Sequence, residues 1–260
     1  MSQDTFFDYP QTIFNCSQGE VKLPIFYYDV SSVLAFYLTD YKKVQKLVEP
    51  LGFMAARFLN GKAMVGFAFY EYRKTDVGSY NEVGLATAIY APDRPRPLLS
   101  LPQLKKNVNR RKMGFYIHHL PVTTAIANAA GREIYGFPKF VTELPFELTD
   151  SHFKGIVKDE QGKEIVTLEG KVKKGIRMSG FDLLLYSYLD KNLMRTVVDV
   201  KARFNTSFFP DWQLTLGKGD HPMRQTIKDM GITGKKPFIV QTTHHFRSRL
   251  HRGEETSNIG

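Results

Sequence analysis

The chain of 260 residues is 42% hydrophobic and 13% aromatic, 24% of its residues are charged, and its formal net charge is +10. This hydrophobicity excludes a disordered chain, and the length is enough for residues 1–260 to form a single domain with a large core. The positive charge would suit nucleic acid, an acidic surface or a small anionic substrate, and alone it does not choose among them.

The first residues carry no recognisable targeting signal. MSQDTFFDYPQTIF lacks the basic region and apolar stretch of a signal peptide, and no run of about 18 apolar residues follows it. We therefore expect a soluble, cytoplasmic protein that does not act at a membrane. Cys16 is the single cysteine, so it cannot form an internal disulfide.

Strands dominate the predicted elements. Residues 62–72 and 83–90 are apolar at nearly every position, which is typical of strands covered on both faces. Residues 152–172 alternate apolar and polar side chains around Glu160-Gln161-Gly162, which predicts a hairpin. With few helical patterns and no internal repeat, the sequence predicts a β-rich α+β fold with mostly antiparallel strands.

Three segments are predicted to be helical. The first, residues 39–49, starts with a threonine and an aspartate that can cap a helix, and it stops before Pro50. The second, residues 121–131, contains AIANAA and ends at Gly131. The third, residues 181–193, is the most apolar, and we expect it to cover a barrel end or a subunit interface.

Two basic clusters and a histidine pair are candidate binding sites. Residues 105–112 (KKNVNRRK) follow a proline-rich segment and are predicted to be a solvated loop, and residues 247–252 a mobile tail. His244 and His245, beside that tail, lack partners at ligand spacing, so we predict no metal site. Neither cluster is interleaved with stacking aromatics, so nucleic-acid binding is the least favoured function.

The segment with the most distinctive chemistry is Gly131–Phe140, GREIYGFPKF. It resembles the signature of acetoacetate decarboxylase-like enzymes, in which a GRE turn precedes an aromatic residue, a proline and a lysine that forms a Schiff base. Further similarities are YLTD at 37–40, SYNE at 79–82 and YIH at 116–118. The resemblance covers roughly residues 24–175 and implies a closed or cone-like β-barrel with a few flanking helices, assembled into a homo-oligomer.

The resemblance implies that Lys139 attacks a substrate ketone and that Glu82 relays protons or orients the amine. An amine attacks only when it is neutral, so the ordinary lysine pKa of about 10.4 must be lowered. The aromatic and proline neighbours of Lys139 would lower that pKa through burial, as in acetoacetate decarboxylase, a known example of such a lysine. The iminium itself withdraws electrons, so neither a metal nor an organic cofactor is expected.

Phe137, Tyr116 and His118 are the candidates for contact with the substrate. His118 and His119 are adjacent, so on a strand they face opposite sides and cannot jointly bind a metal. A hydrogen-bonded core histidine is the simpler interpretation of either one. In the GRE turn, Arg132 and Glu133 are predicted to hold the loop before the lysine through polar contacts.

The chain departs from the family pattern in three places. Phe140 replaces the second lysine that usually follows the Schiff-base lysine, and no basic residue lies between Lys22 and Lys42, where the family decarboxylases carry a pocket arginine. The second pocket glutamate is also missing, because the strand MVGFAFY offers only Glu71 further along. These differences predict a more apolar pocket and a bulkier or less polar carbonyl substrate.

Three functions remain open from the sequence. The leading hypothesis is a cofactor-independent carboxy-lyase that decarboxylates a β-keto acid through a Lys139 iminium. A second is an enzyme that uses the same iminium for aldol, retro-aldol, dehydration or hydration chemistry on a larger carbonyl compound. The third, suggested by the missing charged groups, is a non-catalytic binder of an apolar carbonyl ligand.

Overall fold

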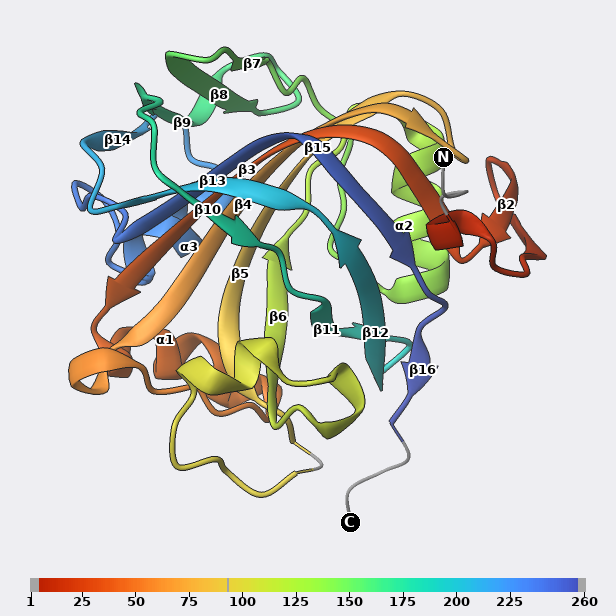
Figure 1. The fold of residues 1–260 in the computed structure, drawn as a ribbon, viewed down its shortest axis with the longest axis horizontal. Helices are drawn as coiled ribbons and strands as arrows, with labels where there is room; N and C mark the ends of the chain where they lie inside the picture. Colours follow the sequence, from red (N-terminus) through yellow and green to blue (C-terminus); the bar gives the residue numbers. More distant parts are fainter. Residues whose placement is uncertain (1–4, 93, 257–260) are drawn as a thin grey trace.

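In the computed structural model, which describes residues 5–92 and 94–256, seven strands form a closed barrel (Figure 1). Each strand pairs with the next around the barrel, and β12 pairs with β15 to close it. In spatial order they are β15 (Ile239–Leu250), β3 (Ile25–Thr39), β4 (Ala63–Thr75), β5 (Tyr80–Tyr90), β6 (Met113–His119), β11 (Leu183–Leu189) and β12 (Asn192–Lys201). The predicted β-rich barrel is confirmed.

One pair of barrel strands is parallel, and the other barrel pairs are antiparallel, in agreement with the expected mostly antiparallel sheet. Strands β6 and β11 run in the same direction, with Leu185 opposite Phe115 and Tyr186 opposite Tyr116. A hairpin turn cannot join parallel neighbours, and here more than 60 residues separate the two strands along the chain. That connection contains a helix and part of a second sheet.

The second sheet covers one side of the barrel and has the order β14 (Trp212–Leu216), β9 (Glu164–Lys171), β8 (His152–Lys158) and β7 (Phe146–Leu148) (Figure 1). Its β8–β9 hairpin confirms the one predicted at 152–172. Phe153 contacts Phe69 of the barrel with ring centroids 5.4 Å apart, and it stacks on Trp212 at 5.3 Å. These aromatic contacts dock the sheet on the barrel.

Shorter strands complete the structure. β13 (Arg203–Phe208) pairs with β15 and β10 (Ile176–Ser179) pairs with β13, while β16 (Glu254–Glu255) pairs with β12. β1 (Thr12–Cys16) and β2 (Gly19–Leu23) form a separate hairpin. Single-turn 3-10 helices lie at Thr5–Phe7, Glu49–Leu51, Leu59–Gly61, Leu101–Lys105 and Val108–Arg110.

Three α-helices flank the barrel, α1 (Tyr41–Val48), α2 (Ala125–Tyr135) and α3 (Pro222–Asp229). Helix α1 confirms the first predicted helix, and the Asp40 side chain accepts a hydrogen bond from the Lys42 amide at 2.7 Å. Helix α2 runs past the predicted end at Gly131 and stops instead at Gly136, whose φ of +65° suits a glycine. No helix within residues 5–92 and 94–256 is long and apolar enough to cross a membrane.

The predicted helix at 181–193 is wrong, because these residues form β11, a turn and the start of β12. Leu184 and Tyr186 face one side of β11 and Leu183 and Leu185 the other, and apolar residues are needed on both sides. A strand buried on two faces lacks the alternation that separates strands from helices. The turn residues Asp190 and Lys191 have φ of 48° and 70°, as a two-residue hairpin requires.

The two basic clusters are also more ordered than predicted. Arg111 is 2% exposed and donates hydrogen bonds to the carbonyl oxygens of Leu104 and Lys106, so residues 105–112 are not a fully solvated loop. Residues 247–250, which were expected to be mobile, belong to β15 and pair with both β3 and β12. Register shifts interrupt the alternation of apolar and polar residues in β15. Its sequence therefore does not show the pattern of a regular strand.

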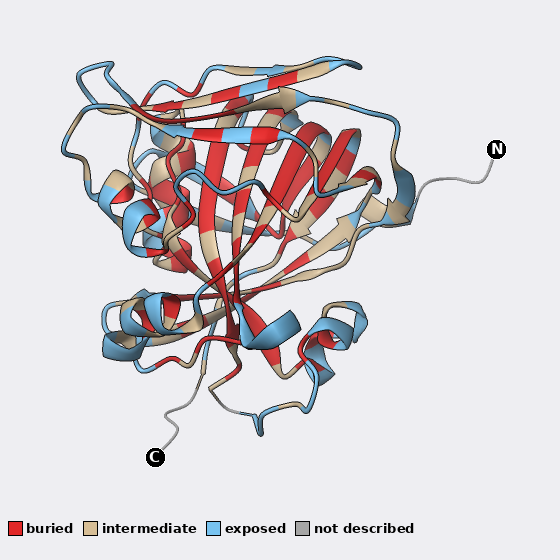
Figure 2. Ribbon diagram, turned by 90° about the vertical axis from the view of Figure 1, so that its left-hand side faces the viewer, coloured by how far each residue is buried: buried red, intermediate tan, exposed pale blue. Residues whose placement is uncertain are grey.

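The barrel strands are buried along most of their length, whereas the surrounding helices have both buried and exposed faces (Figure 2). On β4, Phe67 and Phe69 point outward and pack beneath the second sheet and the helices. Ala68 and Tyr70 alternate with them and point into the barrel. The outward residues therefore form the main core, and the inward residues surround a cavity.

Candidate active site

A cavity of about 120 Å³ lies inside the barrel, and all seven barrel strands contribute residues to its wall. This is far more than the space of roughly 10–15 Å³ that one water molecule needs, so a small organic molecule fits. Within the described part of the chain, the charged side chains that line the cavity are Lys139 and Glu82. They come from elements that are far apart in the sequence.

The segment after α2 places Lys139 at the cavity wall. It runs beside residues 120–122, where the Leu120 amide donates to the Pro138 carbonyl at 3.1 Å and the Val122 amide donates to the Phe140 carbonyl at 2.9 Å. Arg132 donates from Nη1 to the Lys139 carbonyl oxygen at 3.0 Å. The backbone of the lysine is thus held from both sides, which limits where its side chain can point.

Gly131 provides the space that the lysine side chain occupies. A Cβ atom at position 131 would lie 2.3 Å from both Cδ and Cε of Lys139 and 3.0 Å from its Nζ. Any other residue there would displace the lysine. Glycine is therefore required at position 131 because the Lys139 side chain occupies the adjacent space. Its role is steric, and it does not end the helix.

Lys139 and Glu82 form a buried ion pair, with Nζ 2.7 Å from Oε2 of the glutamate. Lys139 is 6% exposed and Glu82 is 8% exposed. The second carboxylate oxygen, Oε1, accepts a hydrogen bond from the Tyr72 hydroxyl at 3.2 Å. Because a buried charge is costly without a partner, each member of this pair stabilises the other.

Tyrosine side chains surround the ion pair. Tyr72 contacts the rings of Tyr27 and Tyr80 with centroid distances of 4.7 and 4.6 Å, and stacks on Tyr70 at 5.3 Å. The Tyr80 ring lies 5.9 Å from Nζ of Lys139. Burial, with a smaller contribution from the Glu82 charge, raises the pKa of the Tyr72 and Tyr70 hydroxyls, which stay neutral donors near pH 7.

The predicted substrate-contact residues divide between the two faces of the barrel wall. Phe137 is 4% exposed and lines the cavity. Tyr116 and His118 do not line it, because Phe115 and Ile117 take the inward positions of β6 and the residues between them must point outward. We therefore correct their assignment as substrate contacts.

His118 is instead a hydrogen-bonded core residue, with Nε2 2.9 Å from Oγ1 of Thr87 on the neighbouring strand. Burial, followed by the charge of His119, lowers the pKa of His118 to about 3. Tyr116 packs against Phe53 with ring centroids 5.1 Å apart. Both residues serve the outer core of the barrel.

The sequence reasoning missed the tyrosines that surround the pair. Tyr70 and Tyr72 are two residues apart on β4, and Tyr80 and Glu82 are two residues apart on β5, so each pair faces the same side. Tyr70 lies directly opposite Glu82, and Tyr72 opposite Tyr80. Recognising residues 70–82 as a hairpin would have brought these four residues together.

A family model for acetoacetate decarboxylase matches residues 10–181. The chain belongs to the acetoacetate decarboxylase family. Solved structures of this fold include an acetoacetate decarboxylase from Legionella pneumophila, which is 15% identical, with 98% of this chain and 94% of that chain covered and a TM-score of 0.66. No match was found among curated protein sequences.

Two further solved structures show the same fold. The enduracididine biosynthesis enzyme MppR, solved with the condensation product of pyruvate and imidazole 4-carboxaldehyde, is 14% identical over 92% of each chain, with a TM-score of 0.63. An acetoacetate decarboxylase-like enzyme from Sphingomonas wittichii RW1 is 11% identical over 91% of this chain and 94% of that chain, with a TM-score of 0.57. The same fold therefore occurs in solved structures whose names mention different carbonyl compounds.

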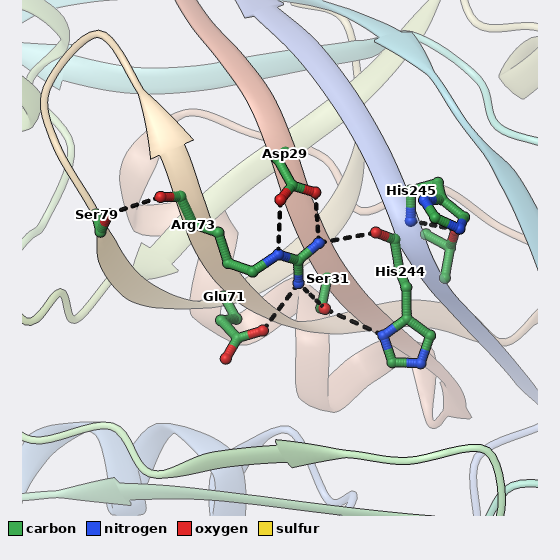
Figure 3. A network of polar contacts seen from close by, with 8 residues as sticks. Asp29, Ser31, Glu71, Arg73, Ser79, His244 and His245 are labelled. Carbon is green, nitrogen blue, oxygen red and sulfur yellow. Dashed lines mark hydrogen bonds and ion pairs between the residues drawn. The ribbon is translucent and has the colours of Figure 1, made fainter.

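Compared with the pattern expected for the family decarboxylases, this cavity has fewer charges. Glu71 does not replace the second pocket glutamate, because it points out of the barrel and accepts a hydrogen bond from Arg73 at 3.0 Å (Figure 3). Arg73 also pairs with Asp29 and donates to the His244 carbonyl at 2.9 Å. This network lies on β3, β4 and β15, outside the cavity wall.

The missing second lysine has little effect on the geometry of the cavity. Phe140, which takes its place, points away from Lys139 and packs against His221 before α3, with ring centroids 5.1 Å apart. Neighbours on an extended segment face opposite sides, so a lysine at 140 would not line the cavity. Among the described residues, no three His, Cys, Asp or Glu side chains gather in a group that could hold a metal.

Proposed function

We propose that this family member is a cofactor-independent lyase that forms a Schiff base through Lys139 and decarboxylates a β-keto acid. The supporting observation is the buried pair of Lys139 and Glu82, 2.7 Å apart in a cavity that no other charged side chain of the described residues lines. A proton that moves along this hydrogen bond converts two charged groups into a neutral amine and a neutral acid. The neutral amine is the form that can attack a carbonyl carbon.

The reaction begins when Nζ of Lys139, having passed its proton to Glu82, attacks the ketone carbon of the substrate. The resulting carbinolamine loses its hydroxyl group as water after Glu82 returns a proton, and an iminium cation forms. The bond between the carboxylate and the α-carbon then breaks, carbon dioxide leaves, and the electron pair moves into the iminium to give an enamine. Protonation of the α-carbon and addition of water release the ketone and restore Lys139.

Glu82 is the acid and base in this proposal because its Oε2 is the only carboxylate oxygen within reach of Nζ in the described part of the site. The Tyr72 hydroxyl holds the other oxygen, which fixes the orientation of the carboxylate. A general acid or base must reach the proton that it moves, and 2.7 Å meets that requirement.

A second candidate uses the same iminium for aldol, retro-aldol or dehydration chemistry. No arginine lines the described cavity, so a substrate carboxylate would meet only hydroxyl donors and the charge of Lys139. Burying a carboxylate without a matching cation costs several kcal/mol. This absence favours a carbonyl substrate without a carboxylate for the second candidate.

Borohydride trapping tests the Schiff base. The protein is mixed with β-keto acids and simple ketones, reduced, digested and analysed by peptide mass spectrometry. We expect a substrate-sized adduct on Lys139 that disappears in Lys139→Ala and persists in Lys154→Ala, which removes an exposed lysine of the outer sheet. Absence of an adduct with every carbonyl compound would favour the non-catalytic binder.

Product analysis separates the two reactions. Release of carbon dioxide from a β-keto acid, at a rate that falls to background in Lys139→Ala, supports decarboxylation. Adduct formation and turnover of a ketone or aldol substrate without carbon dioxide release would support the second candidate instead.

A further inference from the structure

The cavity continues past the ion pair as a strip of wall without large side chains. The inward residues of β4 and β5 form cross-strand pairs, with Tyr70 opposite Glu82, then Ala68 opposite Gly84, then Gly66 opposite Ala86. At a strand rise of about 3.3 Å per residue, the four steps from Glu82 to Ala86 span roughly 13 Å. We call the strip formed by Gly66, Ala68, Gly84 and Ala86 the chain groove.

The walls that face the chain groove are apolar. They are made by Leu34 and Phe36 of β3, Phe115 and Ile117 of β6, and Leu183 and Leu185 of β11. Apart from Lys139 and Glu82 at one end, no charged residue in the described part of the chain lines this space. A polar or charged group in the groove would lose its water without gaining a partner.

Three of the four chain-groove residues are more accessible than Lys139 and Glu82, whereas Gly84 is buried against the Leu120 side chain. Lys139 and Glu82 are almost completely buried, whereas Ala68, Gly66 and Ala86 are half-buried. These three residues lie in the middle of barrel strands whose outward residues are fully buried, so their accessible surface faces the cavity. The accessible end of the cavity lies near Phe36 and Phe181, which are also half-buried.

We propose that the substrate is a ketone or β-keto acid with an unbranched apolar chain that lies in the chain groove. This inference rests on the proposed function, since the carbonyl carbon is placed at Lys139. The carbonyl end occupies the dry end of the cavity and the chain extends toward Phe36 and Phe181. A short substrate such as acetoacetate would leave the groove filled only by water, and would gain none of the free energy of burying a chain.

Binding of secondary alcohols to the unmodified protein tests the groove without using Schiff-base chemistry. Isopropanol, methyl pentyl carbinol and methyl nonyl carbinol have the chains of the corresponding ketones but cannot form an iminium. Measured by calorimetry, affinity is expected to rise about fourfold per added methylene, which corresponds to about 0.8 kcal/mol per buried methylene. Equal affinity for all three alcohols would overturn the proposal.

A steric variant locates the bound chain. Ala68→Leu fills the groove next to Gly84, so it should lower the affinity ratio of the nonyl to the short alcohol at least tenfold, the effect of losing about two buried methylenes. Ala125→Leu makes the same change at an exposed position of α2 and should leave the ratio unaltered. If Ala68→Leu does not fold, Ala86→Leu replaces it, and an unchanged ratio in a folded groove variant contradicts the proposal.

Trapping with acetone and with methyl nonyl ketone then separates this inference from the proposed function. If affinity for the alcohols rises with chain length but no ketone forms an adduct, the proposed binding groove is supported and the proposed Schiff base is rejected. Adducts with ketones, together with alcohol binding that ignores chain length, would retain the Schiff base and reject the groove. Preferential trapping of the long ketone, lost in Ala68→Leu, is the result expected if both hold.

Discussion

Glu82 combines two tasks that usually compete. As a partner of Lys139 it stabilises a buried cation, and in the proposed mechanism it also accepts the proton whose loss makes that cation neutral. Both tasks depend on Oε2, whereas Oε1 is held by Tyr72. The two oxygens can therefore be tested separately by removing the carboxylate or by removing the hydroxyl that orients it.

Replacing Glu82 with glutamine keeps the size of the side chain but removes its ability to take a proton. We expect the rate of adduct formation at Lys139 to fall about 10²-fold or more, the usual contribution of a positioned acid or base. Tyr72→Phe removes only the hydrogen bond to Oε1 and should have a smaller effect, of about tenfold or less. Trapping kinetics measure both rates, and an unchanged rate in Glu82→Gln would remove Glu82 from the mechanism.

At the level of single residues, the sequence indicated Lys139 and Glu82 but not why they meet. The resemblance to the family motifs identified two residues that lie 57 positions apart in the sequence. Only the structure shows that Nζ of Lys139 lies 2.7 Å from Oε2 of Glu82. Tyr116 and His118 were misassigned because proximity to a motif says nothing about which face of a strand a residue occupies. Strand periodicity alone could have separated Phe115 from Tyr116, but not shown which of the two faces the cavity.

Helix α2 and the segment that follows it together position the side chain of Lys139. Gly131 does not end the helix. Helix α2 continues to Tyr135 and ends at Gly136, which has a positive φ. Gly131 then lies beneath the returning side chain of Lys139. The prediction that the helix ends at Gly131 failed because the glycine is required by a contact with a residue outside the helix.

Gly131→Ala separates helix stability from lysine placement. Alanine is a better helix former by about 1 kcal/mol, which offsets part of the roughly 1–3 kcal/mol cost of overpacking. The free energy of unfolding should therefore fall by only about 0–2 kcal/mol, while displacement of Lys139 by its new neighbour lowers the trapping rate about 10²-fold.

Ala125→Gly, at the exposed start of the same helix, is the matched control. It weakens the helix but does not touch the lysine, so its trapping rate should equal that of the unmodified protein. A Gly131→Ala protein that traps ketones normally would show that the lysine can move aside without losing its reactivity.

Whether a strand is buried on one face or on both faces explains which elements could be predicted from the sequence. Strands with one exposed face, as in the hairpin at 152–172, alternate clearly and were identified. Strand β11 is apolar on both faces because one lines the cavity and the other lies against the outer core, so it was mistaken for a helix. Closure by β15 depends on pairing between residues more than 200 positions apart, which no local pattern reports.

The acid stability of the whole molecule should depend on His118. Its folded pKa of about 3 lies below the ordinary value of 6.5, mainly because of burial, so the unfolded chain binds more protons between these values. The stability present above pH 6.5 is therefore lost as the pH falls toward 3, with a slope approaching 1.4 kcal/mol per pH unit. His119, whose pKa burial lowers to about 4, adds to the same slope.

Urea unfolding at a series of pH values measures this dependence. His118→Gln cannot be protonated, so the free energy of unfolding should fall less steeply between pH 6.5 and 3 than in the unmodified protein. Exchanging the exposed His245 for glutamine serves as the control and should leave the slope unchanged. If the free energy of unfolding of His118→Gln falls with pH as steeply as that of the unmodified protein, His118 does not cause the loss of stability in acid.

The position of β15 has a consequence for how the protein is made. This strand fills the gap between β3 and β12, so the barrel stays open until residues 239–250 have been synthesised. Pairings over such a distance form slowly, and chains that wait for them expose apolar surface. Until β15 is in place, the cavity wall lacks Phe246 and Leu250, and the wet, unclosed barrel gives Lys139 no dry surroundings. The surroundings that the proposed Schiff-base chemistry requires at Lys139 are therefore complete only after β15 has paired with β3 and β12.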